Sequence, residues 1–237
     1  FDADLVSRLI RAAFLDDLAW MVAGGALTPW RITIVSTDLN GLLNSDLVRN
    51  VNPSPESALF PDGARTAWIR PGRVLWSWWA DFASSMDFAT QLRYVNAAAV
   101  LGFEYILVDA GWEFGFPDGT QDQFARLAQL VIYAHRQGRQ VDIWVWKLWD
   151  ELRHPTARRA FFQAVKRAGA VGIKIDNIAS LKSESQADVA LYEAILRDAA
   201  AVHLMIHFHG CNKGTGRGRT YPHQRTHEGF LGLEYTA

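Results

Sequence analysis

The sequence is poor in cysteine, in net charge and in long apolar runs. Its 237 residues include one cysteine, Cys211, which excludes an intrachain disulfide framework. The formal net charge is -1, so the chain offers neither a basic surface for a nucleic-acid backbone nor a polybasic patch for a membrane. It also lacks the run of about 18 apolar residues that a membrane-spanning helix needs. We therefore expect no nucleic-acid partner and no membrane span.

Apolar and aromatic residues are plentiful. Hydrophobic residues make up 49% of the chain and charged residues 21%, which is enough to bury a core in a globular protein. Ten tryptophans raise the aromatic content to 12%. Flat rings suit concave ligand sites, including those that stack on sugars, although tryptophans also fill cores. A neutral small-molecule partner fits this composition best.

Strand-like and helix-like patterns alternate from about residue 73 onward. The strand-like runs cover residues 74–78, 103–109, 141–146, 172–176 and 203–209, and the helical patterns cover 88–99, 124–136, 157–168 and 187–201. Such alternation predicts parallel strands, in either a doubly wound sheet or a (β/α)8 barrel. Nearly every strand ends in polar or aromatic residues, as a barrel that draws its site from many strands requires. We expect a truncated (β/α)8 TIM barrel, because five of the eight strands are recognisable.

The first 67 residues have a different character. Residues 28–36 alternate partly, as an antiparallel strand does, and residues 50–63 are rich in Pro, Asn and Ser without periodicity. We expect residues 1–67 to be the end of a β-sandwich domain with a linker, and residues 68–237 to be the partial barrel.

The segment Gly172–Asn177 reads as a buried strand with a lysine and a carboxylate at its end. Side chains alternate across a strand with a period of two residues, so Lys174 and Asp176 share one face. Asp176 is a candidate nucleophile, and the cation of Lys174 favours its ionised form and can hold a substrate hydroxyl. The alternative is a structural ion pair or a helix N-cap.

Further candidates lie at another strand end and in residues 219–234, which we expect to form a long loop after the fifth strand. Asp109 could accept sugar hydroxyls while Trp112 packs on the ring, or the two could be a turn cap and a core residue. Glu228 and Glu234 could supply the second carboxyl group that glycoside cleavage needs, or they could be solvated surface acids.

Three histidines are predicted on one face of the run 203–209. His203, His207 and His209 could hold a metal in a hydrolase, but no other strand end offers a matching pair of ligands. Hydrogen-bonding or substrate-positioning roles are favoured, and His209 is the candidate for substrate contact.

Taken together, the motifs resemble glycoside hydrolase family 97, the α-glucosidases and α-galactosidases. The resemblance runs in order through Thr28–Arg31, Leu42–Pro53, Arg70–Arg73, Trp76–Trp79, Val108–Trp112, Gly172–Asp176, Phe208–Gly210, Arg219–Pro222, Glu228–Gly229 and Glu234–Tyr235. The Lys-x-Asp-Asn segment also resembles the nucleophile strand of melibiase-type α-galactosidases. Several separate motifs in the same order make the likeness specific.

This resemblance implies a β-sandwich, a central barrel and a further β-domain. It implies that Asp176 is the nucleophile of a retaining enzyme, because inverting members carry a glutamate where Gly210 stands. It maps the general acid/base to Glu234 and two Ca²⁺ ligands to Glu228 and Glu234. Asn177 and His223 depart from the family pattern, which puts the choice of substrate in question.

We therefore expect a retaining glycoside hydrolase that cleaves terminal α-linked hexose, with an α-galactoside or a related oligosaccharide as substrate. An α-glucosidase of the same family and a catalytically inactive carbohydrate-binding fragment are the alternatives. The resemblance also predicts that the full-length protein is periplasmic or secreted. The sequence leaves the oligomeric state open.

Overall fold

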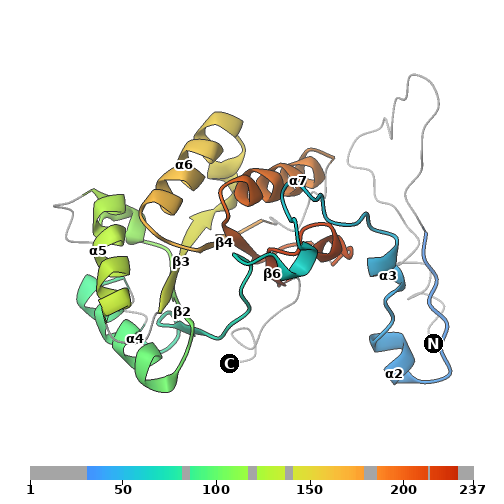
Figure 1. The fold of residues 1–237 in the computed structure, drawn as a ribbon, viewed down its shortest axis with the longest axis horizontal. Coiled ribbons are helices and arrows are strands. Elements are labelled where there is room, and N and C mark those ends of the chain that lie inside the picture. The colour runs from blue at the N-terminus through green and yellow to red at the C-terminus, as the bar shows by residue number, and fades with distance from the viewer. Residues whose placement is uncertain are drawn as a thin grey trace.

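The computed structural model describes residues 31–81, 86–116, 122–136, 141–178, 186–212 and 214–228 (Figure 1). Within these ranges the chain forms one parallel sheet with helices along its outer face. None of the described helices is long and apolar enough to cross a membrane.

The sheet contains six strands in sequence order. They are β1 (Val74–Trp76), β2 (Tyr105–Val108), β3 (Asp142–Leu148), β4 (Gly172–Asp176), β5 (Met205–Phe208) and β6 (Gln224–His227). Every neighbouring pair is parallel. A doubly wound sheet reverses its strand order at a switch point, whereas a barrel keeps it. The unbroken order therefore identifies an α/β half-barrel.

Four helices connect the first five strands. They are α4 (Phe88–Leu101), α5 (Gln123–Arg136), α6 (Pro155–Arg167) and α7 (Gln186–Ala201), and they lie side by side around the sheet (Figure 1). Gly102 ends α4 with a φ of 72°, a left-handed conformation in which glycine carries no steric penalty. The predicted strands and helices are confirmed, with shifts of a few residues at their ends.

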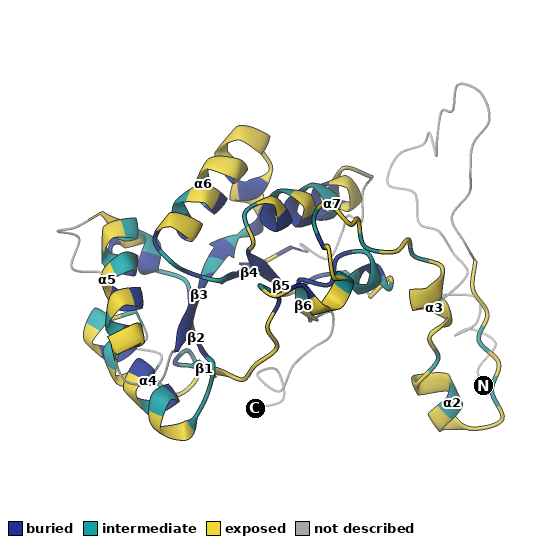
Figure 2. Cartoon of the chain, viewed as in Figure 1, coloured by how far each residue is buried: buried dark blue, intermediate teal, exposed yellow. Residues whose placement is uncertain are grey.

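Two apolar layers flank the sheet. The outward side chains of the strands, such as Ile106, Ile143 and Ile173, pack against the helices in the main core. A smaller inner cluster is formed by Tyr105, Leu107, Trp144 and Met205. Figure 2 shows that burial is concentrated in the strands and on the helix faces turned toward them. Because side chains alternate along each strand, the inner face is left to carry the site.

One strand was not predicted from the sequence. Residues 219–234 were expected to be a long loop, but Gln224–His227 pairs with β5 and forms β6. The four side chains are polar and at least partly exposed, so they show no apolar alternation. Tertiary pairing, rather than local sequence, creates this strand, and it places Glu228 directly at its end.

The segment before the barrel contains short helices. Residues 31–67 form α2 (Leu39–Leu43), α3 (Leu47–Asn50) and a 3-10 turn, Gly63–Arg65, without a strand in this described range. The strand expected over residues 28–36 is therefore not formed from residue 31 onward, and residues 28–30 lie outside the described ranges. A strand needs a partner for its backbone groups, and none lies beside this segment in the described part. The β-sandwich and the boundary at residue 68 stay predictions.

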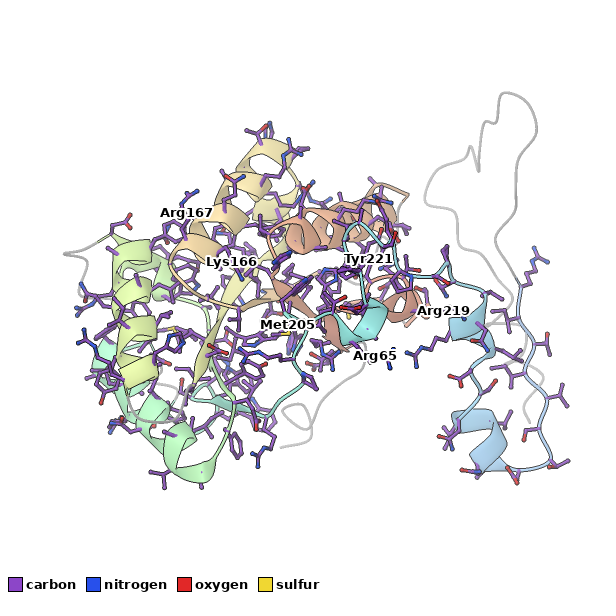
Figure 3. All side chains as sticks on the ribbon, in the orientation of Figure 1. Arg65, Lys166, Arg167, Met205, Arg219 and Tyr221 are labelled. Carbon is purple, nitrogen blue, oxygen red and sulfur yellow. The ribbon has the colours of Figure 1, made fainter. Side chains whose placement is uncertain are left out.

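The same segment docks on the barrel through the turn before β6. Arg219 reaches toward α3 and donates to the side-chain oxygen of Asn50 at 2.9 Å (Figure 3). Asn52 donates to the carbonyl oxygen of Thr215 at 2.8 Å. These contacts join residues that are more than 160 positions apart in the chain, at separations of 169 and 163. They anchor the turn that leads into β6.

Candidate active site

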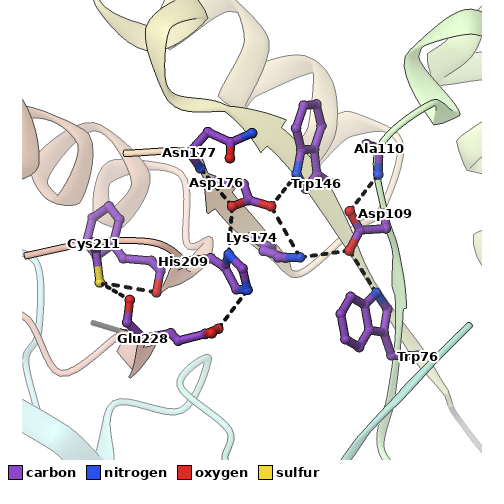
Figure 4. A network of polar contacts seen from close by, with 11 residues as sticks. Trp76, Asp109, Ala110, Trp146, Lys174, Asp176, Asn177, His209, Cys211 and Glu228 are labelled. Carbon is purple, nitrogen blue, oxygen red and sulfur yellow. Dashed lines mark hydrogen bonds and ion pairs between the residues drawn. The ribbon is translucent and has the colours of Figure 1, made fainter. Parts of the chain in front are cut away.

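Polar side chains from all six strands converge at the carboxyl edge of the sheet (Figure 4). The set consists of Trp76, Asp109, Trp146, Lys174, Asp176, His209 and Glu228. Trp76 and Asp176 end their strands, Asp109, His209 and Glu228 directly follow theirs, and Trp146 and Lys174 lie two residues before the ends of β3 and β4. This edge is where parallel α/β barrels build their ligand sites.

Lys174 is the buried cation at the centre of the set. Its ammonium lies 2.8 Å from Oδ2 of Asp109 and 3.4 Å from Oδ2 of Asp176. It also lies 4.7 Å from the centre of the Trp76 ring, a cation–π contact. The lysine is 3% exposed, so its charge is compensated within the protein rather than by water.

Asp109 is fully hydrogen-bonded and 2% exposed. Oδ2 accepts the indole N–H of Trp76 at 2.7 Å in addition to the Lys174 contact. Oδ1 accepts the backbone N–H of Ala110 at 2.7 Å. Asp109 and Lys174 therefore form a buried ion pair beneath the more exposed part of the site.

Four donors surround the carboxylate of Asp176. Oδ1 contacts His209 Nδ1 at 2.7 Å and accepts the backbone N–H of Asn177 at 2.7 Å. Oδ2 accepts the indole N–H of Trp146 at 2.9 Å and faces Lys174. Burial alone would raise the pKa of Asp176, but the His209 hydrogen bond, the Lys174 charge and the Trp146 hydrogen bond outweigh it and hold the pKa below its ordinary range. The group is therefore ionised at neutral pH.

His209 bridges two carboxylates. Its Nδ1 faces Asp176, and its Nε2 lies 2.7 Å from Oε2 of Glu228. The hydrogen bond to Asp176 is the main cause of the raised pKa of His209, against opposing effects of burial and of the Lys174 charge. An imidazole can donate to both acids at once only as the imidazolium. Negative and positive side chains therefore alternate along one series of contacts: Asp109, Lys174, Asp176, His209 and Glu228.

The more accessible half of this series of side chains runs from Asp176 through His209 to Glu228. The side chain of Asp176 is 13% exposed, and those of Glu228 and His209 are 22% and 25% exposed, whereas those of Asp109 and Lys174 are 3% and 4% exposed. A cavity of about 380 Å³ continues from Lys174 toward the amino ends of the strands, lined by Trp76, Tyr105 and other inner side chains. A ligand at the carboxyl edge would therefore meet Asp176 before it meets the buried pair.

Most predicted site residues are brought together, but Trp112 is not among them. Asp109, Lys174, Asp176, His209 and Glu228 form the network described above, and Glu234 lies outside the described residues. Trp112 was expected to pack against a sugar ring, yet it is 0% exposed and donates its indole N–H to the carbonyl oxygen of Trp146 at 2.8 Å. Its ring belongs to the core, so the expected stacking role is corrected to a supporting one.

Trp76 and Trp146 are site residues that sequence reasoning missed. Trp76 was named only within the motif Trp76–Trp79, and Trp146 only as the aromatic end of the run 141–146, and neither was given a role in binding a carboxylate. The signal lay in the strand period: Trp146 pairs with Lys174 in the register of β3 and β4, so it faces the same interior as the lysine. Only the fold shows which acid each indole contacts.

The histidines do not form a shared metal-binding face. His203 precedes β5 with a φ of 59° and stacks on Trp68 at 5.0 Å between ring centres. His207 points inward, and burial and the nearby Lys174 charge lower its pKa to about 3, which keeps it neutral. Across the described ranges, no three His, Cys, Asp or Glu side chains are grouped to hold a metal. His203 is thus a helix-end residue rather than a strand ligand.

Calcium needs a larger oxygen cage than the described residues provide. Ca²⁺ takes about six to eight oxygen ligands. Glu228 offers one carboxylate, which is already paired with His209, and Glu234 is outside the described part. The residues described here do not complete such a site, so calcium binding stays a prediction.

Comparison with known proteins points to one family. Residues 68–230 match the family model described as Glycoside hydrolase 97. The chain is 34% identical over 223 residues to a probable retaining alpha-galactosidase of Streptomyces bingchenggensis, covering 90% of this chain and 33% of that protein. It is 27% identical over 216 residues to the retaining alpha-galactosidase of Bacteroides thetaiotaomicron, covering 87% of this chain and 30% of that protein.

The fold is likewise similar to that of a solved enzyme. A beta-arabinopyranosidase structure superposes with a TM-score of 0.64 at 26% identity, covering 83% of this chain and 30% of that one. The chain spans about a third of the length of the curated relatives it matches, 33% and 30%.

Proposed function

The chain belongs to glycoside hydrolase family 97, and from this membership we propose that the full-length protein hydrolyses terminal α-galactosides with retention of configuration. The names of the curated relatives support this reaction and this sugar. The substrate would be an α-galactoside, free or at the end of an oligosaccharide.

The observation that carries the proposal is the environment of Asp176. The carboxylate is ionised, partly exposed and located at the carboxyl end of β4. A glycosidase nucleophile must be charged and reachable, and it must be held in one orientation before the sugar arrives. The four donors around Asp176 meet these requirements, which supports its assignment as the nucleophile.

In the first step, a carboxylate oxygen of Asp176 attacks the anomeric carbon of the sugar. The bond from that carbon to the leaving oxygen breaks, and the electron pair goes to the leaving oxygen. Glu234, the proposed general acid, gives that oxygen a proton. The products are the free aglycone alcohol and a glycosyl ester of Asp176.

In the second step, water attacks the same carbon from the opposite side. Glu234, now ionised, takes the proton from the water, and the pair of the ester bond returns to Asp176. Two inversions restore the original anomeric configuration. His209 keeps Asp176 and Glu228 in fixed relation, and Lys174 compensates the charge that returns to the nucleophile.

The stereochemistry of the product tests the proposal. Proton NMR of an aryl α-galactoside reaction should show the α anomer of galactose first. Asp176→Asn should lose nearly all turnover, and Asp176→Gly with azide should release the β-galactosyl azide. Asp150→Asn, which alters an exposed acid of the turn after β3, serves as the control. Unchanged turnover in Asp176→Asn refutes the assignment, and sugar binding without wild-type turnover supports an inactive binding protein.

A panel of aryl glycosides tests the sugar. We propose galactose over glucose because both curated relatives are named alpha-galactosidases. The panel should also contain a β-arabinopyranoside, because the similar solved structure is a beta-arabinopyranosidase. Faster hydrolysis of the α-glucoside than of the α-galactoside would contradict the galactose proposal and identify the protein as an α-glucosidase.

Calcium binding is a separate proposal. We propose that Glu228 and Glu234 contribute ligands, because carboxylates are the oxygen donors that Ca²⁺ prefers. Chelation should lower activity and melting temperature, and added Ca²⁺ should restore both. A protein that keeps its activity and melting temperature after chelation, with no calcium detected by elemental analysis, would contradict it.

A further inference from the structure

The two oxygens of Asp176 are held unequally. Oδ1 has two short contacts, at 2.7 Å to His209 Nδ1 and at 2.7 Å from the backbone N–H of Asn177. Oδ2 has one short contact, at 2.9 Å from the indole N–H of Trp146, and a longer one of 3.4 Å to Lys174. A carboxylate oxygen has about two lone-pair positions for hydrogen bonds. Both are filled at Oδ1, whereas one is only weakly engaged at Oδ2.

Building on the proposed retaining reaction, we infer that Oδ2 of Asp176 is the oxygen that bonds to the anomeric carbon, and that Trp146 is a positioning residue for this oxygen. Lys174 competes little for Oδ2, because its ammonium is closer to Asp109, at 2.8 Å. The weakly engaged lone pair of Oδ2 is therefore the one open to a sugar. The Trp146 N–H occupies the other lone pair of Oδ2, and this hydrogen bond fixes the direction in which the open lone pair points.

The same asymmetry suits the covalent intermediate. When Oδ2 bonds to the anomeric carbon, Oδ1 becomes the carbonyl oxygen of the ester and keeps both of its hydrogen bonds. Oδ2 loses its negative charge, so its contacts with Trp146 and Lys174 weaken. In the second step the ester bond breaks and the electron pair returns to Oδ2. Trp146 and Lys174 then stabilise the charge as it develops, which is the role of a preorganised donor.

The fold holds the Trp146 indole rigidly enough for this role. Trp146 lies in β3, opposite Lys174 in the register with β4. The carbonyl oxygen of Trp146 accepts the indole N–H of Trp112 at 2.8 Å, and Trp112 is completely buried. The core tryptophan thus anchors the backbone of the site tryptophan. This link gives the buried Trp112 a function in the geometry of Asp176.

The Trp146 N–H should matter most in the second step, in which the sugar is released from Oδ2. A hydrogen bond to a charged group contributes roughly a 10- to 100-fold effect on an equilibrium or a rate. Removal of this N–H should slow release of the sugar from Oδ2 by about that factor. Formation of the ester should be affected less, because the attacking oxygen gives up the same hydrogen bond in that step. The glycosyl–enzyme should then accumulate.

The test is Trp146→Phe in the full-length protein, assayed with an aryl α-galactoside that has a good leaving group. Trp144→Phe is the matched control, because Trp144 lies on the same strand and face, and its indole nitrogen has no hydrogen-bond partner in the described ranges. For Trp146→Phe we expect kcat to fall about 10- to 100-fold and KM to fall with it, with a pre-steady-state burst of the phenol. For Trp144→Phe we expect no burst and no fall in KM.

Three outcomes separate this inference from the proposed function. A wild-type protein that is inactive or inverting removes the retaining reaction and this inference together. A retaining wild type whose Trp146→Phe variant shows equal falls in kcat and kcat/KM, without a burst, overturns the inference alone. If Trp146→Phe does not fold, benzothienylalanine at position 146 keeps the ring shape without the N–H, and it must show the same lowered KM and burst.

Discussion

His223 should make the protein sensitive to mild acid. The ring is 0% exposed and stacks on Phe60 at 5.3 Å between ring centres. Burial lowers its pKa from 6.5 to about 3. Between these values the unfolded chain binds a proton that the folded protein does not, so stability falls as pH decreases. At pH 5 the loss relative to pH 7 is about 2 kcal/mol for this one group.

His223→Phe tests this value. Phenylalanine continues the stack with Phe60 and cannot be protonated, so the variant should lose about 2 kcal/mol less than the wild type between pH 7 and pH 5. The assay is urea unfolding at both pH values, followed by tryptophan fluorescence. His154→Gln, at the exposed start of α6, is the control and should keep the wild-type pH dependence. Equal losses of unfolding free energy in wild type and His223→Phe would show that His223 is not the source of the acid sensitivity.

Two further substitutions test the barrel and the site. Lys174→Met leaves Asp109 and Asp176 without their shared cation, so we expect a loss of about 3–5 kcal/mol in unfolding free energy; a loss below about 1 kcal/mol in urea unfolding would contradict the buried ion pair. Gly216→Ala adds a Cβ atom 2.6 Å from a carbonyl oxygen of α3 at a φ of +77°, so it should lower the melting temperature, whereas Gly214→Ala meets open space and should not. Equal melting temperatures for the two alanine variants would show that the α3 contact is not close.

The barrel strands and helices could be predicted because their sequences carry their own periodicity. Gly172–Asp176 alternates between two isoleucines that join the core and two polar residues that face the interior, and the structure keeps this strand without a shift. Gly102 follows the helical pattern 88–99 in the sequence and ends α4, because the left-handed conformation at a helix end favours glycine. Elements that bury one face need apolar residues at regular spacing, and this spacing can be recognised in the sequence.

Other features depend on contacts that the sequence does not encode locally. Gln224–His227 is a strand only because β5 offers it a parallel edge, and its polar side chains hide this. The sequence around Trp112 is compatible with a sugar contact and with a core position. Trp112 is 0% exposed in the structure, so it is a core residue. His223 departs from the family pattern, and the structure places it in the core with Phe60 rather than in the site. For Trp112 and His223, burial in the core shows that the side chain is structural rather than part of the site.

The substrate-contact predictions for Asp109, Lys174 and His209 illustrate a related difficulty. All three were named as substrate contacts, and the structure joins them to Asp176 directly or through one neighbour. Sequence cannot show that their polar atoms bind one another, because this depends on register and side-chain direction. Their contacts with a sugar stay proposals.

In the proposed reaction, Asp176 forms a covalent bond with the sugar. The most direct test of this bond is to react the full-length protein with a 2-deoxy-2-fluoro-α-galactosyl fluoride or a related slow substrate, digest the protein, and map the labelled peptide by mass spectrometry. We expect one fluorosugar attached to Asp176, in the peptide that contains Gly172–Asn177. A label on another carboxylate, such as Glu228 or Asp109, or active enzyme that never carries a label, would contradict it.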